Sequence, residues 1–323
     1  MTLLVKDYLG KRGKKGDIGI EIEVEADLPL PQINTEHWKT QAEGSIRDGV
    51  EYVTTGPLTL VDKTRAIKYL ASKLDTKALK IKEDSPRTSV HVHKNILYHT
   101  PIEYWTTACA YWLTEELLFD FCGDYRKGNL FCLRLSDAEG VIKYCINDLK
   151  KDLPFHSFNN NDCIRYAGQN LAATAKFGSL EYRGMRFTLD PDRLDKWTSE
   201  INTLHTKSKE YHSPATLMDA FFKNDKKKDF LETLYSPEFV YDLTKVKGWE
   251  EKLERNEGIL CELAYYHDWT AWQSKIEKYR NSITDEQSKI KTGPNDQFTI
   301  RYNEIAATIQ NTTAPLAMPE AGR

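Results

Sequence analysis

The sequence predicts an α+β fold in which the first two thirds of the chain supply a sheet and the last third supplies helices. Two observations carry this prediction. Apolar and polar residues alternate in four separate segments before residue 190, with the two-residue period of a half-buried strand. Beyond residue 190 the apolar residues recur at steps of three and four, which is the period of an amphipathic helix.

The first alternating segment spans residues 17–27. Its aliphatic residues Ile20, Ile22 and Val24 alternate with the carboxylates Glu21, Glu23 and Glu25. Successive strand side chains point to opposite faces, so the carboxylates share one face at a spacing of roughly 7 Å. Such carboxylates repel each other in a partly dry cleft, and divalent cations remove the repulsion. The pattern also fits an amphipathic strand with a solvated acidic face.

Three further segments alternate in the same way, at residues 50–54, 88–93 and 177–183. Their polar faces carry Glu51 in the first, Ser89, His91 and His93 in the second, and Glu181 with Arg183 in the third. Two imidazoles at positions i and i+2, together with carboxylates from other strands, can enclose a divalent metal ion. An arginine beside a carboxylate suits a phosphate next to that ion, because the planar guanidinium pairs with phosphate oxygens.

Residues typical of helix starts occur between these alternating segments and after the last of them. They are Asp62 before an apolar stripe that ends at Leu74, the capping box of Thr100 and Glu103 with Pro101, and the cap-plus-proline pairs Asp190-Pro191 and Ser213-Pro214. We expect the helix after Thr100 to run to about Phe121 with one apolar face. The aromatic stripes beyond residue 190 indicate core packing.

The composition narrows the class of protein. The 323 residues are 40% hydrophobic, which is enough for one large domain or two of ordinary size. The net charge of −3 and the pI near 6.3 argue against nucleic acid as a partner, for which a pI above about 9 is typical. No apolar run approaches the roughly 18–20 residues of a membrane span, and no signal peptide is recognisable. None of the six cysteines forms a C-x-x-C pair, so we expect reduced thiols in a cytoplasmic protein.

The order of the motifs resembles the amidoligase family of glutamine-synthetase-like carboxylate–amine ligases, of the type encoded by phages and bacteria. The chain carries G-x-E-x-E from Gly19, W…G-S…G-x-E-Y-V-T-x-G-P-L from Trp38, H-V-H from His91, R-x-x-N-x-F-C from Arg126, R-Y…N-L from Arg165 and G-S-L-E-Y-R from Gly178. This resemblance covers about residues 17–200. The chain departs from it at Glu43-Gly44-Ser45, where the family has Asp-Gly-Ser.

The resemblance implies a curved antiparallel sheet with helices on its outer face, and ATP with two or three Mg²⁺ or Mn²⁺ ions on its concave face. The implied metal ligands are Glu21, Glu23, His91 and Glu181. The implied phosphate or acyl-substrate arginines are Arg183, Arg126 and Arg165, and Tyr166 and Asn170 match the nucleotide-side R-Y…N pattern. Glu51 is either a further ligand or the group that binds or deprotonates the amine. His93 binds metal, nucleotide phosphate or substrate.

The activity implied is the ATP-dependent joining of a carboxylate to an amine through an acyl phosphate, on small-molecule or peptide substrates. It would take place in the cytoplasm, which for a phage protein is that of the host. A metal-dependent hydrolase is an alternative that would work without ATP. A non-catalytic interaction protein on the same fold is another, although such a protein would have little reason to keep all these side chains.

The resemblance and the composition together divide the chain into four parts. We expect a polar lead-in at residues 1–16 and the catalytic domain at residues 17–200. A helical region should follow at residues 201–310, and a Thr-, Pro- and Ala-rich disordered tail at residues 311–323.

Overall fold

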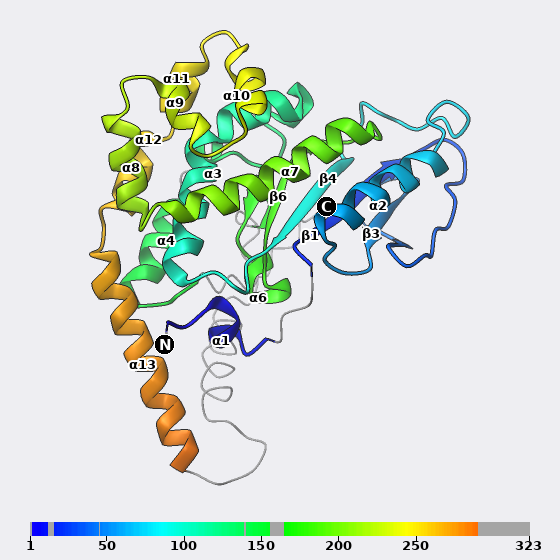
Figure 1. Ribbon diagram of the computed structural model, residues 1–323. Coiled ribbons are helices and arrows are strands. Elements are labelled where there is room, and N and C mark those ends of the chain that lie inside the picture. The colour runs from blue at the N-terminus through cyan, green and yellow to red at the C-terminus, as the bar shows by residue number, and fades with distance from the viewer. Residues whose placement is uncertain (1, 12–15, 45, 139, 156–164, 290–323) are drawn as a thin grey trace, which may run out of the picture. The chain divides into compact units, whose positions relative to one another are not determined.

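A computed structural model shows an α+β fold with a six-stranded antiparallel sheet, helices, and a helical C-terminal part (Figure 1). The structure describes all residues except 1, 12–15, 45, 139, 156–164 and 290–323. For residues 283–289 it describes the backbone but not the side chains. Residues 1–273 form one compact unit and residues 274–323 a second. The domain boundary predicted after residue 200 falls inside helix α7 (Pro191–Lys207). The predicted tail at residues 311–323 lies outside the described residues.

The sheet has the strand order β2-β3-β1-β4-β6-β5, and all the strand pairs are antiparallel. The strands are β1 (Ile18–Glu25), β2 (Trp38–Gln41), β3 (Gly49–Thr54), β4 (Ser89–Asn95), β5 (Gln169–Asn170) and β6 (Ser179–Arg186). The alternation patterns correctly predicted β1, β3, β4 and β6, but they missed the short strands β2 and β5. The predicted α+β class and the antiparallel pairing are confirmed. The sheet is not strongly curled (Figure 1), in contrast to the curved sheet that the resemblance implies.

One face of the sheet is apolar and packs against helices. Ile20, Ile22 and Val92 are at most 1% exposed. Helices α2 (Leu60–Lys73), α3 (Pro101–Cys122) and α7 cover this side in Figure 1, with α3 contacting β6 and α7 contacting β4. Since strand side chains alternate, this packing leaves the glutamates and histidines of β1 and β4 on the opposite face.

Helix α3 is central to the helical layer. Its residues from Tyr104 to Phe119 are all buried, because the helix contacts β6 as well as α8, α10, α11 and α12. The prediction that this helix has a single apolar face is therefore wrong. Its start is as predicted, since the Thr100 hydroxyl accepts from the N–H of Glu103 and the Glu103 carboxylate accepts from the N–H of Thr100.

The other helices are α1 (Val5–Leu9), α4 (Gly140–Lys150), α6 (Ala173–Phe177), α8 (Pro214–Lys223), α9 (Lys227–Glu232), α10 (Pro237–Thr244), α11 (Trp249–Glu254), α12 (Glu257–Ala264) and α13 (Trp269–Lys289), with short 3-10 helices η1 (Asp124–Arg126), η2 (Leu135–Asp137) and η3 (Ser208–Glu210). Asp190 and Ser213 cap α7 and α8 as predicted. Helix α2 is capped by Thr59, whose hydroxyl accepts from the N–H of Asp62, so Asp62 is not the cap.

Part of the predicted lead-in is packed. Helix α1 has a buried Val5, whose N–H donates to the carbonyl of His99 at 2.8 Å. Along the described residues, no helix combines the length and the apolar character that a membrane crossing needs.

Candidate metal centre

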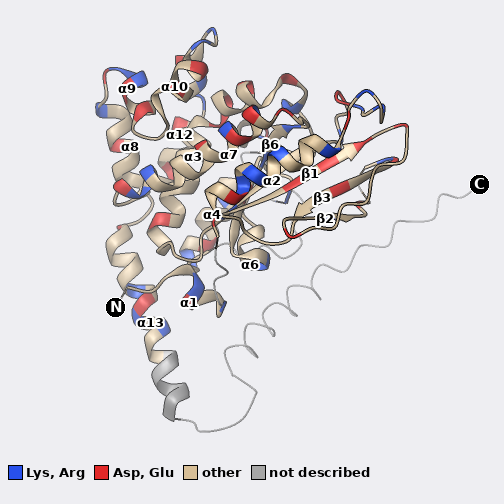
Figure 2. Ribbon diagram, turned by 45° about the vertical axis from the view of Figure 1, so that its right-hand side comes forward, with Lys and Arg blue, Asp and Glu red and all other residues tan. Residues whose placement is uncertain are grey.

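The polar face of the sheet brings together acidic and imidazole side chains from four strands. Acidic residues recur along β1, and β3 carries one, Glu51 (Figure 2). Directly opposed residues of an antiparallel pair share a face, with their Cβ atoms about 4.5–5.5 Å apart. The opposed pairs are Glu21–His91, Glu23–Glu51, His93–Glu181 and Glu181–Asn170. The register of the sheet therefore gathers most of the predicted site residues in one place.

Glu21 contacts both histidines of β4. Its Oε2 lies 3.3 Å from Nδ1 of His91, and its Oε1 lies 3.2 Å from Nε2 of His93. The same Nδ1 of His91 lies 3.5 Å from Oε1 of Glu181. Burial by itself would raise the pKa of Glu21, but His93 and His91 hold that pKa well below its ordinary value. Glu21 is thus a carboxylate kept ionised at the centre of the cluster.

Two groups of possible metal ligands share Glu21. One group is Glu21, Glu51 and His91, and the other is Glu21, His93 and Glu181. Within each group the ligand atoms lie within 4.8 Å of one another. Carboxylate oxygens and imidazole nitrogens are common ligands of divalent ions. The described residues could therefore hold two neighbouring cations on either side of Glu21.

Glu51 is a buried carboxylate with an unfavourable charge. Burial, and then the nearby Glu21 and Glu23, raise the pKa of Glu51 to about 8, although a hydrogen bond from Gln41 at 2.6 Å opposes this shift. A cation between Glu51 and Glu21 would remove the repulsion. Both roles predicted for Glu51, a ligand or a group that meets the amine, fit this position.

Glu23 and Ser89 hold His91 from its other side. Glu23 accepts a hydrogen bond from the Ser89 hydroxyl, and the Ser89 Oγ lies 2.8 Å from Nε2 of His91. Glu23 belongs to neither ligand group, and its Oε2 lies 3.9 Å from the same Nε2 of His91, with Ser89 bonded to both. The geometry suits an orienting role for Glu23 better than the direct ligation that we expected. Ser89 shares the alternating face of His91, which is the signal that marks it in the sequence.

Three polar side chains near the cluster had no predicted role, and the structure assigns a contact to each. Ser179 Oγ lies 3.0 Å from Nδ1 of His93, which turns the other ring nitrogen toward Glu21. Gln41 binds Glu51, and only the unpredicted strand β2 places it there. Glu25 lies outside the centre, where its oxygens accept from the N–H of Arg47 at 2.7 Å and from the Ser85 hydroxyl at 2.6 Å.

Two arginines lie beside the carboxylates. Arg183 forms an ion pair with Glu181, and its Nε donates to the carbonyl of Phe131 at 3.1 Å. Arg126 is 1% exposed and donates from Nη2 to the carbonyl of Arg183 at 2.8 Å. In the described part of the chain, Nε and Nη1 of Arg126 have no hydrogen-bond partner. A buried guanidinium with free donors is costly unless an anion pairs with it.

The R-Y…N motif is divided between the site and the surface. Asn170 donates to Oε2 of Glu181 at 2.6 Å and so orients a candidate ligand. The ring centroid of Tyr166 lies 6.0 Å from the guanidinium carbon of Arg183 and 5.5 Å from that of Arg165. Arg165 is exposed, and residues 156–164 before it lie outside the described part of the chain. Asn170 and Tyr166 thus border the cluster, whereas Arg165 is exposed and lies against the ring of Tyr166.

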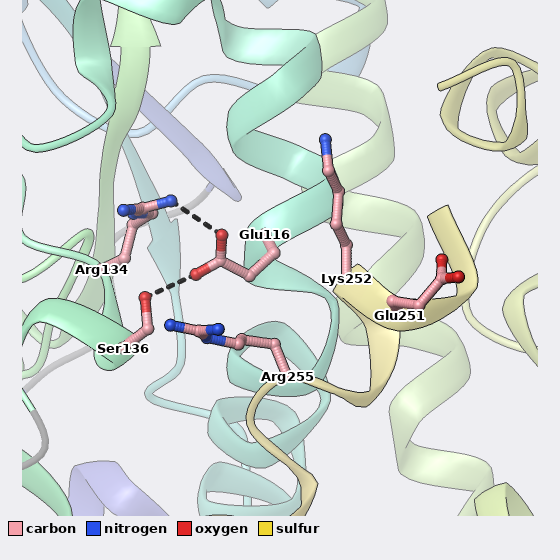
Figure 3. A pocket seen from close by; sticks show the side chains of 6 residues that line it. All are labelled: Glu116, Arg134, Ser136, Glu251, Lys252 and Arg255. Carbon is pink, nitrogen blue, oxygen red and sulfur yellow. Dashed lines mark hydrogen bonds and ion pairs between the residues drawn. The ribbon is translucent and has the colours of Figure 1, made fainter. Parts of the chain in front are cut away.

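A separate pocket of about 330 Å³ is lined by Glu116, Arg134, Ser136, Glu251, Lys252 and Arg255, none of which belongs to the metal centre (Figure 3). Arg134 and Ser136 point toward the Glu116 carboxylate and donate to it at 2.8 and 2.6 Å. Lys252 donates to Asp120 at 2.6 Å. Glu116, Arg134 and Lys252 thus have partners within the protein, and we assign no ligand to this pocket.

Comparison of the chain with protein-family models and with curated protein sequences gives no match. The motif order and the geometry of the centre are therefore what an assignment of function rests on.

Proposed function

We propose that the protein is an ATP-dependent carboxylate–amine ligase of the amidoligase type. The observation that carries this proposal is the position of two ligand groups, joined at Glu21, beside Arg183 and the buried Arg126. Carboxylates and imidazoles bind divalent cations, and guanidinium groups with free donors bind phosphates. A nucleoside triphosphate with its divalent ions needs both kinds of group at one place.

The donor set fits the expected ions. The two groups offer three carboxylates and two imidazoles, a mixture that suits Mn²⁺ and, through its oxygens, Mg²⁺. Bound ions would neutralise phosphate charge, and ATP would supply the phosphoryl group that converts a carboxylate to an acyl phosphate.

The remaining side chains position the ligands and meet the phosphates. Asn170 and Arg183 hold the two oxygens of Glu181, and Ser179 holds the ring of His93. The two free donors of Arg126 would pair with a phosphate or an acyl oxygen, which removes the cost of leaving them buried and unpaired. These contacts exist without ligand, so the site needs little ordering when it binds.

The test is a thermal-shift and calorimetric comparison of a non-hydrolysable ATP analogue with Mn²⁺ against each alone, on the wild type and on Glu181→Gln. A ligand present at 100 times its Kd stabilises the folded state by about 2.7 kcal/mol. We expect the nucleotide to add a stabilisation of this size only when Mn²⁺ is also present, and we expect the variant to lose it. The melting temperature of the ligand-free variant shows whether it is folded. ADP release can then be screened with mixtures of carboxylates and amines.

Stabilisation by Mn²⁺ alone, with none added by the nucleotide, would contradict the ligase proposal. It would favour the metal-dependent hydrolase, because the two ligand groups suit that chemistry equally well. Absence of both effects would favour the non-catalytic interaction protein.

A further inference from the structure

The metal centre has one side that solvent reaches. The residues Glu23, Glu51, His91 and Glu181 are each at most 5% exposed. The side chains of Glu21 and His93 are more open, at 25% and 12%. A ligand therefore approaches the centre from the side of Glu21 and His93.

An aromatic ring lies on that side. Phe177 is the last residue of α6 and is 52% exposed. Its ring centroid lies 5.4 Å from that of His93, with the two planes at 85°. Single exposed aromatic residues are ordinary on protein surfaces. Direct contact with a candidate metal ligand at the open side of the centre is what distinguishes Phe177.

The position of Phe177 is fixed by the end of its helix. Gly178 has φ of +73°, and its N–H donates to the carbonyl of Thr174 at 2.9 Å. A Cβ at Gly178 would lie 2.6 Å from a methyl carbon of Leu97, so only glycine fits this turn. The ring is thus presented by a rigid backbone, which favours binding because little order is gained when a ligand arrives.

The charges around the ring favour an anionic ligand. The ammonium of Lys176 lies 4.7 Å from the ring centroid of Phe177, and Lys176 is itself exposed. Nζ of Lys11 donates to the backbone carbonyl of Lys176 at 2.7 Å, so a second ammonium lies next to the residue that precedes Phe177. Two cations would repel an amine substrate that came to this ring. A flat aromatic group attached to phosphates matches both the ring and the lysines.

We infer that Phe177 packs against the base of a nucleotide whose phosphates reach the metal centre. This inference rests on the proposed function and adds the base-contacting residue to it. An aromatic side chain stacks on any base, so Phe177 contributes affinity without selecting one base strictly.

The experiment measures binding by calorimetry on the full chain in the presence of Mn²⁺. Two ligands are compared, a non-hydrolysable ATP analogue and inorganic tripolyphosphate, which has the phosphates but no base. The variants are Phe177→Ala and the more conservative Phe177→Leu. Phe222→Ala is the matched control, because Phe222 is 48% exposed on α8.

We expect both Phe177 variants to bind the ATP analogue about tenfold more weakly, as loss of one base–aromatic stack would produce, while the affinity for tripolyphosphate changes less than about twofold. Unchanged affinity for the analogue in both variants would overturn the inference and leave the ligase proposal standing. An equal loss for both ligands would also overturn it, since Phe177 would then only support His93. A wild type that binds Mn²⁺ but neither ligand would overturn the inference together with the ligase proposal.

Discussion

Glu21 lies directly opposite His91 across the β1–β4 pair, and 3.3 Å separates its carboxylate Oε2 from the imidazole Nδ1. The other oxygen of Glu21 reaches His93, two residues further along the same strand. One carboxylate thus joins the two candidate ligand groups. The two cations that these groups could hold would depend on each other through Glu21.

Replacement of Glu21 should therefore remove both cation sites at once. We expect Glu21→Gln to weaken Mn²⁺ binding by at least about a hundredfold, because the amide carries no charge to balance either ion. Electron paramagnetic resonance of free Mn²⁺ measures this. Glu25→Gln is the matched control on the same strand, where the carboxylate binds Arg47 and Ser85 instead. Equal Mn²⁺ binding by the two variants would mean that Glu21 is not a ligand.

Replacement of Arg126 should weaken phosphate binding but leave the free energy of unfolding nearly unchanged. Arg126→Met removes a buried charge whose Nε and Nη1 are unpaired in the described part of the chain. The lost hydrogen bond to Arg183 and the relieved desolvation offset each other, so the free energy of unfolding should change by less than about 1 kcal/mol. Binding of tripolyphosphate with Mn²⁺ should fall by about tenfold or more.

Urea denaturation and calorimetry measure these two quantities, and the exposed Arg255→Met serves as control. A large loss of stability with full tripolyphosphate affinity would show that Arg126 has a structural role only.

The fold should lose stability in mild acid because of two buried histidines. His99 and His205 lie in the core, 3.2 Å apart between Nε2 and Nδ1, and Tyr182 lies 2.5 Å from the other nitrogen of His205. Burial holds the pKa of both imidazoles well below the ordinary value of 6.5, with Lys209 and Lys94 adding to the effect at His99, and His99 and the same two lysines adding to it at His205. As the pH falls, these imidazoles are protonated in the unfolded chain before they are protonated in the folded protein. The free energy of unfolding is therefore fully present above pH 6.5 and declines below it.

The decline amounts to at most about 1.4 kcal/mol per pH unit for each histidine. Denaturation at pH 7.0 and 5.5 measures it in the wild type and in His99→Gln and His205→Gln. Each variant should show a smaller difference between the two pH values than the wild type, whereas the exposed His212→Gln should match the wild type. Identical differences in all four proteins would contradict the assignment.

A buried lysine fastens α2 to α7. Lys63 is 1% exposed, lies 3.0 Å from the carboxylate of Asp195 and donates to the Ser199 hydroxyl at 2.8 Å. Lys63→Met keeps the side-chain volume but removes the cation from Asp195, which keeps only its hydrogen bond from the Thr64 hydroxyl among the contacts of the described residues, so we expect a loss of about 1–2 kcal/mol in the free energy of unfolding. Urea denaturation checks this, with the exposed Lys68→Met on the same helix as control. A loss no larger than that of the control would show that the pair contributes nothing.

Local patterns in the sequence predicted the elements that depend on local physics. Alternation located β1, β3, β4 and β6, and the caps at Thr100, Asp190 and Ser213 located three helix starts. Side-chain alternation and capping hydrogen bonds join residues only a few positions apart, so they are visible in the sequence. The predicted start of α2 was wrong because both Thr59 and Asp62 are residue types that cap helices, and in the structure Thr59 is the cap.

Contacts between distant segments could not be predicted in this way. The burial of α3 on nearly every side depends on the later helices that pack against it. The strands β2 and β5 are short, and each exists because a longer strand, β3 or β6, pairs with it. Gln41 and Asn170 reach Glu51 and Glu181 only through that pairing.

The sequence by itself determined which side chains share a face, because a two-residue period turns Glu21 and Glu23, or His91 and His93, to one side of their strand. It also supplied the chemistry of the candidate site, since carboxylates, imidazoles and an arginine are present at those positions. Tertiary structure alone decided that Glu21 meets both histidines, that Glu23 holds His91 through Ser89, and that Glu25 lies outside the centre. The register between strands is set by the core and the connecting loops, which join residues far apart in the chain.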